Sequence, residues 1–135
     1  MTTRLLLLAA WGCTARVTAG ESCSAATFAA QPGEHITSVQ EKPLSVRSVK
    51  DVVHSAAGDW PTGTVIRFEL VRQGPQSASR ATRGDSQGRF SIGHVGPGEY
   101  CYRASAVGWQ SVIGRLVVSR DGPTDPIQLT LALGI

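Results

Sequence analysis

Residues 85–109, DSQGRFSIGHVGPGEYCYRASAVGW, contain the pattern that decides the fold of this chain. The turn sequence Asp85–Gly88 leads into a short alternating run, Arg89–Ile92. A glycine- and proline-containing loop, Gly93–Gly98, separates it from a longer alternating run that begins at Tyr100. Apolar and polar residues that alternate between turns are typical of β-strands with one buried face. The stretch therefore predicts two strands with their bounding turns, and it contains no recognisable catalytic arrangement.

The same alternation continues on both sides of this stretch. In Thr64–Val71 the apolar residues point one way and the charged residues point the other, and Ile127–Leu133 alternates just as regularly. A polar run, Ser77–Arg83, is typical of an edge strand. About seven strands separated by turn signals predict an all-β sandwich. The predicted strands cover residues 44–54, 64–71, 77–83, 89–92, 100–106, 110–119 and 127–133.

Period-two alternation also assigns side chains to the two faces of the strand that begins at Tyr100. Tyr100 and Tyr102 share one face with the alanines that follow, and we expect them to build the core together with Phe90. Cys101 lies on the opposite face, which is the outside of the sheet.

Length and charge limit the range of functions. The 135 residues fit one domain with a hydrophobic core, and 41% hydrophobic with 17% charged residues is ordinary for a folded chain. The net charge is +3, but Arg4 and Arg16 fall in a predicted leader, which leaves 13 − 2 = 11 basic against 10 acidic residues. This balance gives no clustered basic surface of the kind that nucleic acid requires.

The N-terminus predicts export. Met1–Ala19 has a positive charge at Arg4, a leucine-rich core too short to span a bilayer, and a small-residue cleavage site before Gly20. An alternative is a bacterial lipoprotein signal with Cys13 as the acylated residue, although Trp11 occupies a place where a small residue is usual. The expected location is secreted or periplasmic, with membrane attachment only through Cys13. We divide the chain into a signal peptide (1–19), an irregular N-terminal arm (20–43) with a short helix near residues 24–30, and a β-domain (44–135).

Two cysteines remain after the leader, Cys23 and Cys101. Because two cysteines in an oxidising compartment usually pair, we expect a disulfide between them. It would fix the N-terminal arm over the outside of the sheet. The alternative is two free or intermolecular thiols.

The order of these features resembles the carboxypeptidase regulatory-like domain. The residues that carry the resemblance are Gly63–Phe68, the Gly-Arg-Phe at Gly88–Phe90, the Pro-Gly-x-Tyr at Pro97–Tyr100, and Gly108–Trp109. The similarity covers Val46 to Leu133. It implies a seven-stranded Greek-key sandwich of the transthyretin-like class. It also implies a stabilising, interaction or surface module rather than an enzyme.

Candidate functional residues are few. His35, His54 and His94 lie in separate segments without metal-ligand spacing, so isolated imidazoles are favoured over a metal site, and no cofactor is indicated. Trp60 and Trp109 stand at turns, where each is expected to cover an end of the core, with contact to a sugar ring as the alternative.

We therefore expect a non-catalytic exported module with a binding, adhesion or structural role at the cell envelope and an unidentified protein or glycan partner. One alternative is a carbohydrate-binding module. Another is a small transthyretin-like hydrolase, which would need His54 or His94 beside an arginine. The hydroxyisourate hydrolases of that class end in a Tyr-Arg-Gly-Ser segment, and this chain ends in Leu-Gly-Ile.

Overall fold

The computed structural model describes residues 23–30, 37–55, 64–74 and 78–134. This part of the chain is all-β, with nine strands in two sheets and a single 3-10 turn, η1 (Ala25–Thr27). The large sheet has the order β1-β8-β7-β4-β5, and β2 also pairs with β8; the small sheet has the order β6-β3-β9. The strands of the large sheet are β1 (Thr37–Val39), β2 (Leu44–Val46), β4 (Arg67–Arg72), β5 (Ser79–Arg83), β7 (Gly98–Ser105) and β8 (Ser111–Val118). Those of the small sheet are β3 (Val49–Ser55), β6 (Arg89–Ile92) and β9 (Ile127–Leu131).

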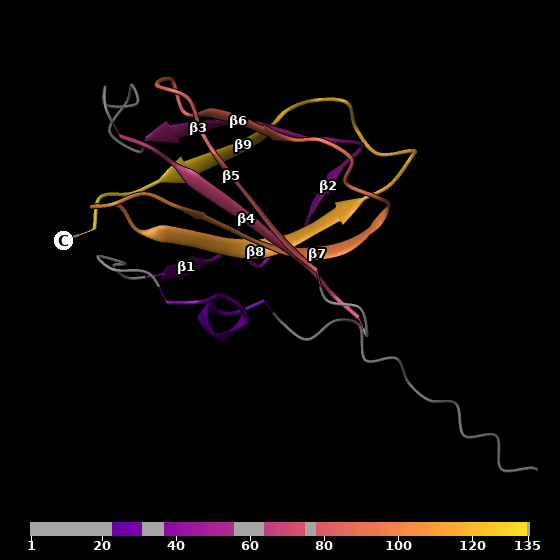
Figure 1. Cartoon of the computed structure of the whole chain (residues 1–135), viewed down its shortest axis with the longest axis horizontal. Coiled ribbons are helices and arrows are strands. Elements are labelled where there is room, and N and C mark those ends of the chain that lie inside the picture. Colours follow the sequence, from indigo (N-terminus) through magenta and orange to yellow (C-terminus); the bar gives the residue numbers. More distant parts are fainter. Residues whose placement is uncertain (1–22, 31–36, 56–63, 75–77, 135) are drawn as a thin grey trace, which may run out of the picture.

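The hydrophobic core lies between the two sheets, which form separate layers in Figure 1. Alternate residues of β4, β7 and β8 point into it from the large sheet, and those of β6 and β9 point into it from the small sheet. At its centre Phe68 stacks on Phe90 from the opposite sheet, with ring centroids 4.3 Å apart, and on Tyr102 at 5.8 Å. The predicted core face of Phe90, Tyr100 and Tyr102 is therefore confirmed.

The strand number differs from the sequence prediction at two places. The β-favouring run 44–54 is two strands, because the chain leaves the large sheet after Val46 and enters the small sheet at Val49. This crossing is held by Pro123, whose carbonyl accepts a hydrogen bond of 3.0 Å from the Arg47 N–H. Gly122 packs so closely there that a Cβ would lie 2.5 Å from the Val46 backbone.

The second difference is β1, which lies within the arm predicted to be irregular. It pairs in parallel with the first half of β8, Thr37 opposite Ser111, while β2 pairs in parallel with the second half, Leu44 opposite Leu116. The two short strands thus occupy one edge of the large sheet in succession. The short helix expected near residues 24–30 is a single 3-10 turn.

One side of the sandwich is joined by the turn between β5 and β6, because β5 forms the edge of the large sheet and β6 the edge of the small sheet. The edge position predicted for the polar strand is confirmed. Asp85 shapes the turn: its Oδ1 accepts hydrogen bonds of 2.9 Å from the backbone N–H groups of Gln87 and Arg89. Gly88 supplies the left-handed conformation (φ 78°) that the turn needs.

On the other side of the sandwich the two sheet edges, β1–β2 and β9, are not joined by a hairpin. Among the described residues, backbone contacts tie this side at its two ends. At one end, residues after β9 pair with residues before β8, with Trp109 bridged to Leu133. At the other end, the β8–β9 connection contacts the crossing from β2 to β3, and the Arg47 N–H donates to the Pro123 carbonyl at 3.0 Å. We call the part between these ends the open side.

Candidate functional site

The arm segment 23–30 covers the outer face of the large sheet, the face turned away from the core. Cys23 and Phe28 form a second apolar cluster there with Cys101 and Ile113. Figure 1 shows the 3-10 turn of this segment beside the large sheet, on the side away from β3, β6 and β9. The Cys101 face, expected to be the outside, is therefore buried under the protein's own N-terminal segment.

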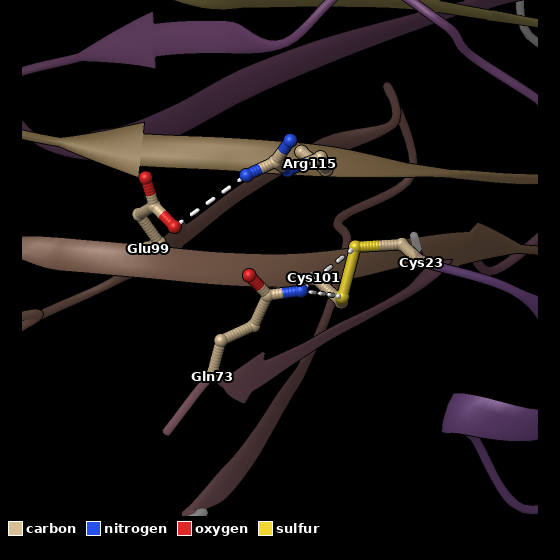
Figure 2. Close-up of polar contacts among 5 residues, drawn as sticks. All are labelled: Cys23, Gln73, Glu99, Cys101 and Arg115. Atoms are coloured by element: carbon tan, nitrogen blue, oxygen red, sulfur yellow. Dashed lines mark hydrogen bonds and ion pairs between the residues drawn. A yellow bond between two sulfur atoms is a disulfide. The ribbon is translucent and has the colours of Figure 1, made fainter. Parts of the chain in front are cut away.

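A disulfide joins Cys23 to Cys101, as predicted, with an S–S distance of 2.01 Å. Both cysteines are buried. Gln73, which follows β4, points its side-chain amide at the two sulfur atoms (Figure 2). Its Nε2 donates to Cys101 Sγ at 3.0 Å and to Cys23 Sγ at 3.6 Å. The bridge is thus enclosed by protein groups on the sheet side and by Phe28 and its neighbours on the arm side.

A buried ion pair lies beside the disulfide on the same face. Arg103 Nε is 2.5 Å from Glu69 Oε2, and the two side chains are 1% and 12% exposed. Arg103 Cζ also lies 5.0 Å from the ring centroid of Phe28. A cation this deeply buried requires such partners, because an uncompensated buried charge costs several kcal/mol. At the margin of this face, Arg115 Nη2 pairs with Glu99 Oε2 at 3.4 Å (Figure 2).

A cleft of about 550 Å³ opens on the open side of the sandwich. One wall is the connection from β1 into β2, and the other is β9. Residues of β7 and β8 form the floor. The cleft is lined by Gln40, Lys42, Pro43, Leu44, Ser45, Tyr102, Val112, Gln128, Leu129 and Thr130.

The floor of this cleft depends on a glycine. Tyr102 of β7 lies across Gly114 of β8, and a Cβ on Gly114 would be 2.6 Å from the Tyr102 hydroxyl oxygen. Only glycine leaves space for the phenol at this position, because any side chain would occupy the volume of the ring. Tyr102 thereby extends from the centre of the core to the cleft floor.

Among the predicted histidine and tryptophan candidates whose side chains the structure describes, His94 and Trp109, neither lies in the outer-face cluster or in the cleft lining. His94 is exposed in the β6–β7 loop, and the cleft lining contains no histidine. His54 stands five residues beyond Val49 on β3, and Val49 pairs with Ile92 near His94. Their backbone positions are therefore separated by about 16 Å along the strand direction. The side chain of His54 is outside the described residues, as are His35, Trp60, Cys13 and the predicted leader.

Trp109 belongs to the core. It is 6% exposed and packs in the main hydrophobic cluster, which is the expected position of a lid over one end of the sandwich. A ring that is buried in this way has no face available to stack on a sugar. The carbohydrate alternative therefore rests on Trp60 alone.

Sequence reasoning found the disulfide but missed Phe28, Glu69 and Arg103 as parts of one cluster. The Glu69–Arg103 pair had a detectable signal, because both residues occur on the outward faces of strands that the alternation predicts. Their register, Glu69 opposite Arg103, comes only from the pairing of β4 with β7. The cleft had no signal in the sequence, because its walls belong to different sheets.

In the described part of the chain, no group of three or more His, Cys, Asp or Glu side chains is arranged to hold a metal ion. A search of the same residues finds no helix that is long and apolar enough to cross a membrane. Among known proteins, no family model, no curated protein and no solved structure matches this chain.

Proposed function

We propose that this protein is an exported, non-catalytic β-sandwich module with a binding or structural role at the cell envelope. The observation that carries the proposal is the Cys23–Cys101 disulfide, which joins positions 78 residues apart. Stable bridges of this kind are typical of oxidising compartments and rare in the cytosol. The predicted leader at Met1–Ala19 supports the same location independently.

The non-catalytic character is supported by how the polar side chains are used. The buried Arg103 pairs with the half-buried Glu69, which also contacts Arg67, and Phe28 closes the site above Arg103. Their position under the arm gives a substrate no access. The alternative of a small hydrolase is weakened because His54 lies five residues along β3 from Val49, and Val49 pairs with the end of β6 that leads to His94.

The resemblance to carboxypeptidase regulatory-like domains remains part of this proposal. Two local features agree with a shared architecture: the Gly88 turn before Phe90 and the Pro-Gly segment before Tyr100. The hydroxyl of Tyr100 donates to the Gly96 carbonyl at 2.6 Å and thereby fixes the loop that precedes β7. This contact gives the Pro-Gly-x-Tyr sequence a structural role rather than a catalytic one.

Export is tested by expressing the full chain, with a C-terminal tag, in a bacterial host and separating cytoplasm, periplasm and membranes. We expect mature protein with an oxidised Cys23–Cys101 bridge outside the cytoplasm. Intact mass distinguishes a chain that begins at Gly20 from one that begins at an acylated Cys13, and Cys13→Ala is the matched control. Unprocessed chain with reduced thiols in the cytoplasm would overturn the proposal. Cross-linking in intact cells then identifies the envelope partner.

A further inference from the structure

We propose that the cleft on the open side binds a small amphipathic molecule with an apolar chain and an anionic head group, such as a free alkyl carboxylate. The inference deepens the proposed function by naming a ligand class for a binding module. It does not depend on export, because the cleft is a property of the folded domain.

The shape of the cleft fits a small ligand. Its volume of about 550 Å³ lies within the roughly 300–1,000 Å³ that is usual for small-molecule sites. The Trp109–Leu133 bridge and the Arg47–Pro123 hydrogen bond tie the two ends of the open side. The walls are therefore held at fixed separation by backbone contacts, and the cleft is formed before a ligand arrives.

The side chains that line the cleft differ between its deep part and its opening. Val112, Leu129 and Tyr102 are buried residues that line it, so the deep part offers core side chains to an apolar chain. Apart from Pro43, the exposed lining residues, among them Gln128 and Thr130 of β9, are polar. A ligand that places hydrocarbon inside and a polar group at the opening satisfies both parts.

The sign of the head group follows from the charged lining. Of the ten residues that line the cleft, Lys42 alone carries a charge, and there is no carboxylate among them. An ammonium group at the opening of the cleft attracts an anion and repels a cation. The amide groups of Gln40 and Gln128 add hydrogen-bond donors for carboxylate oxygens.

A sugar fits this cleft poorly. Sugar rings stack on exposed aromatic faces, and the aromatic ring of the lining, Tyr102, is fully buried and stacks on Phe68. Tyr102 therefore contributes to the floor of the cleft but exposes no ring face on which a sugar could stack. An alkyl chain has no need of an aromatic platform.

The test is a titration of the folded, oxidised protein followed by two-dimensional amide NMR. The probes are sodium decanoate below its micellar concentration, 1-decanol as the uncharged match, and decyltrimethylammonium as the cationic match. We expect saturable shifts at Leu44, Val112, Leu129 and Thr130, with affinity highest for decanoate and lowest for the cation. Shifts confined to other surfaces, or no saturable shifts with decanoate, would overturn the proposal.

Two variants separate the roles of charge and volume. Lys42→Gln is expected to weaken decanoate binding about fivefold, the effect of one exposed charge, and to leave decanol binding unchanged. Thr130→Trp fills the opening and is expected to weaken both ligands. Ser91→Trp on β6 is its matched control, because Ser91 is an exposed strand position outside the lining. Equal loss in both tryptophan variants would contradict the assignment to the cleft.

Vesicles distinguish a free amphiphile from a membrane as its source. Phosphatidylglycerol vesicles are not expected to shift the cleft resonances, since the deep part accepts one chain and not a bilayer surface. Binding to these vesicles through Lys42 without binding of decanoate would refute the proposal. All these outcomes are independent of where the protein is located in the cell.

Discussion

The ring of Phe28 lies over the guanidinium group of Arg103, with Arg103 Cζ 5.0 Å from the ring centroid. This contact joins the arm to the strand that the disulfide also reaches, since Cys101 and Arg103 are neighbours on the same face of β7. The aromatic face is attractive to a cation and also excludes water from it. The arm segment 23–30 therefore completes the outer face of the large sheet.

The Glu69–Arg103 pair gives the first prediction. Glu69→Ala leaves Arg103 buried without its carboxylate, so we expect a loss of roughly 3–5 kcal/mol in the free energy of unfolding. The double variant Glu69→Leu/Arg103→Met removes both charges and is expected to recover most of this loss. Urea denaturation of the three proteins measures the effect. A double variant as unstable as the single one would show that the ion pair itself stabilises the fold.

The disulfide gives the second prediction. Cys23→Ser/Cys101→Ser is expected to lower the free energy of unfolding by roughly 3–5 kcal/mol, because the bridge closes a long loop in the unfolded chain. The comparison is made by urea denaturation of the variant and of oxidised wild type. Wild type treated with reductant should match the variant. Identical midpoints for oxidised and reduced protein would contradict the prediction.

The turn at Asp85 gives a prediction about pH. Hydrogen bonds from the backbone N–H groups of Arg89 and Gln87 lower the pKa of the Asp85 carboxyl below its usual value. A carboxyl whose pKa is lower in the folded state stabilises the fold above its unfolded value of about 3.9, and this contribution is lost as pH falls through the folded pKa. Asp85→Ala should thus lower the melting temperature at pH 7 and have a smaller effect at pH 2. Ser86→Ala, in the same exposed turn, is the control, and a pH-independent difference would refute the assignment.

Gly114 gives a prediction about packing. Gly114→Ala would place a Cβ 2.6 Å from the Tyr102 hydroxyl oxygen and 2.7 Å from its Cζ. We expect a loss of about 2 kcal/mol, because the ring can move only by displacing core side chains. Gly93→Ala is the matched control, since nothing lies within 4 Å of a Cβ there. Thermal unfolding of both variants checks the prediction, and equal melting temperatures would contradict it.

The alternation of apolar and polar residues predicted the strands whose buried face can be identified from neighbouring residues alone. Alternation identified the core faces of β4, β7 and β9, and the compartment argument identified the cysteine pair. Alternation did not identify β1. Its three residues have no apolar alternation, and they form a strand only by pairing with β8, more than 70 residues away. The split at Arg47 was missed for a similar reason, since the residues before and after it favour β-structure equally and only the sheets differ.

The candidate sites show the same limit. Arg103 stands on a face that alternation marks as external, and it is buried because a segment some 75 residues earlier folds over it. The cleft arises where the edges of two sheets face each other, and no sequence pattern encodes the distance between such edges. Both features belong to tertiary packing rather than to periodicity.

The sequence separation of the disulfide also orders events during biosynthesis. Cys23 leaves the ribosome 78 residues before its native partner Cys101. The apolar cluster that seats the bridge also needs Ile113 of β8. The native bridge can therefore form only after most of the chain has been made, and oxidation of Cys23 before Cys101 of β7 emerges can produce only non-native pairings.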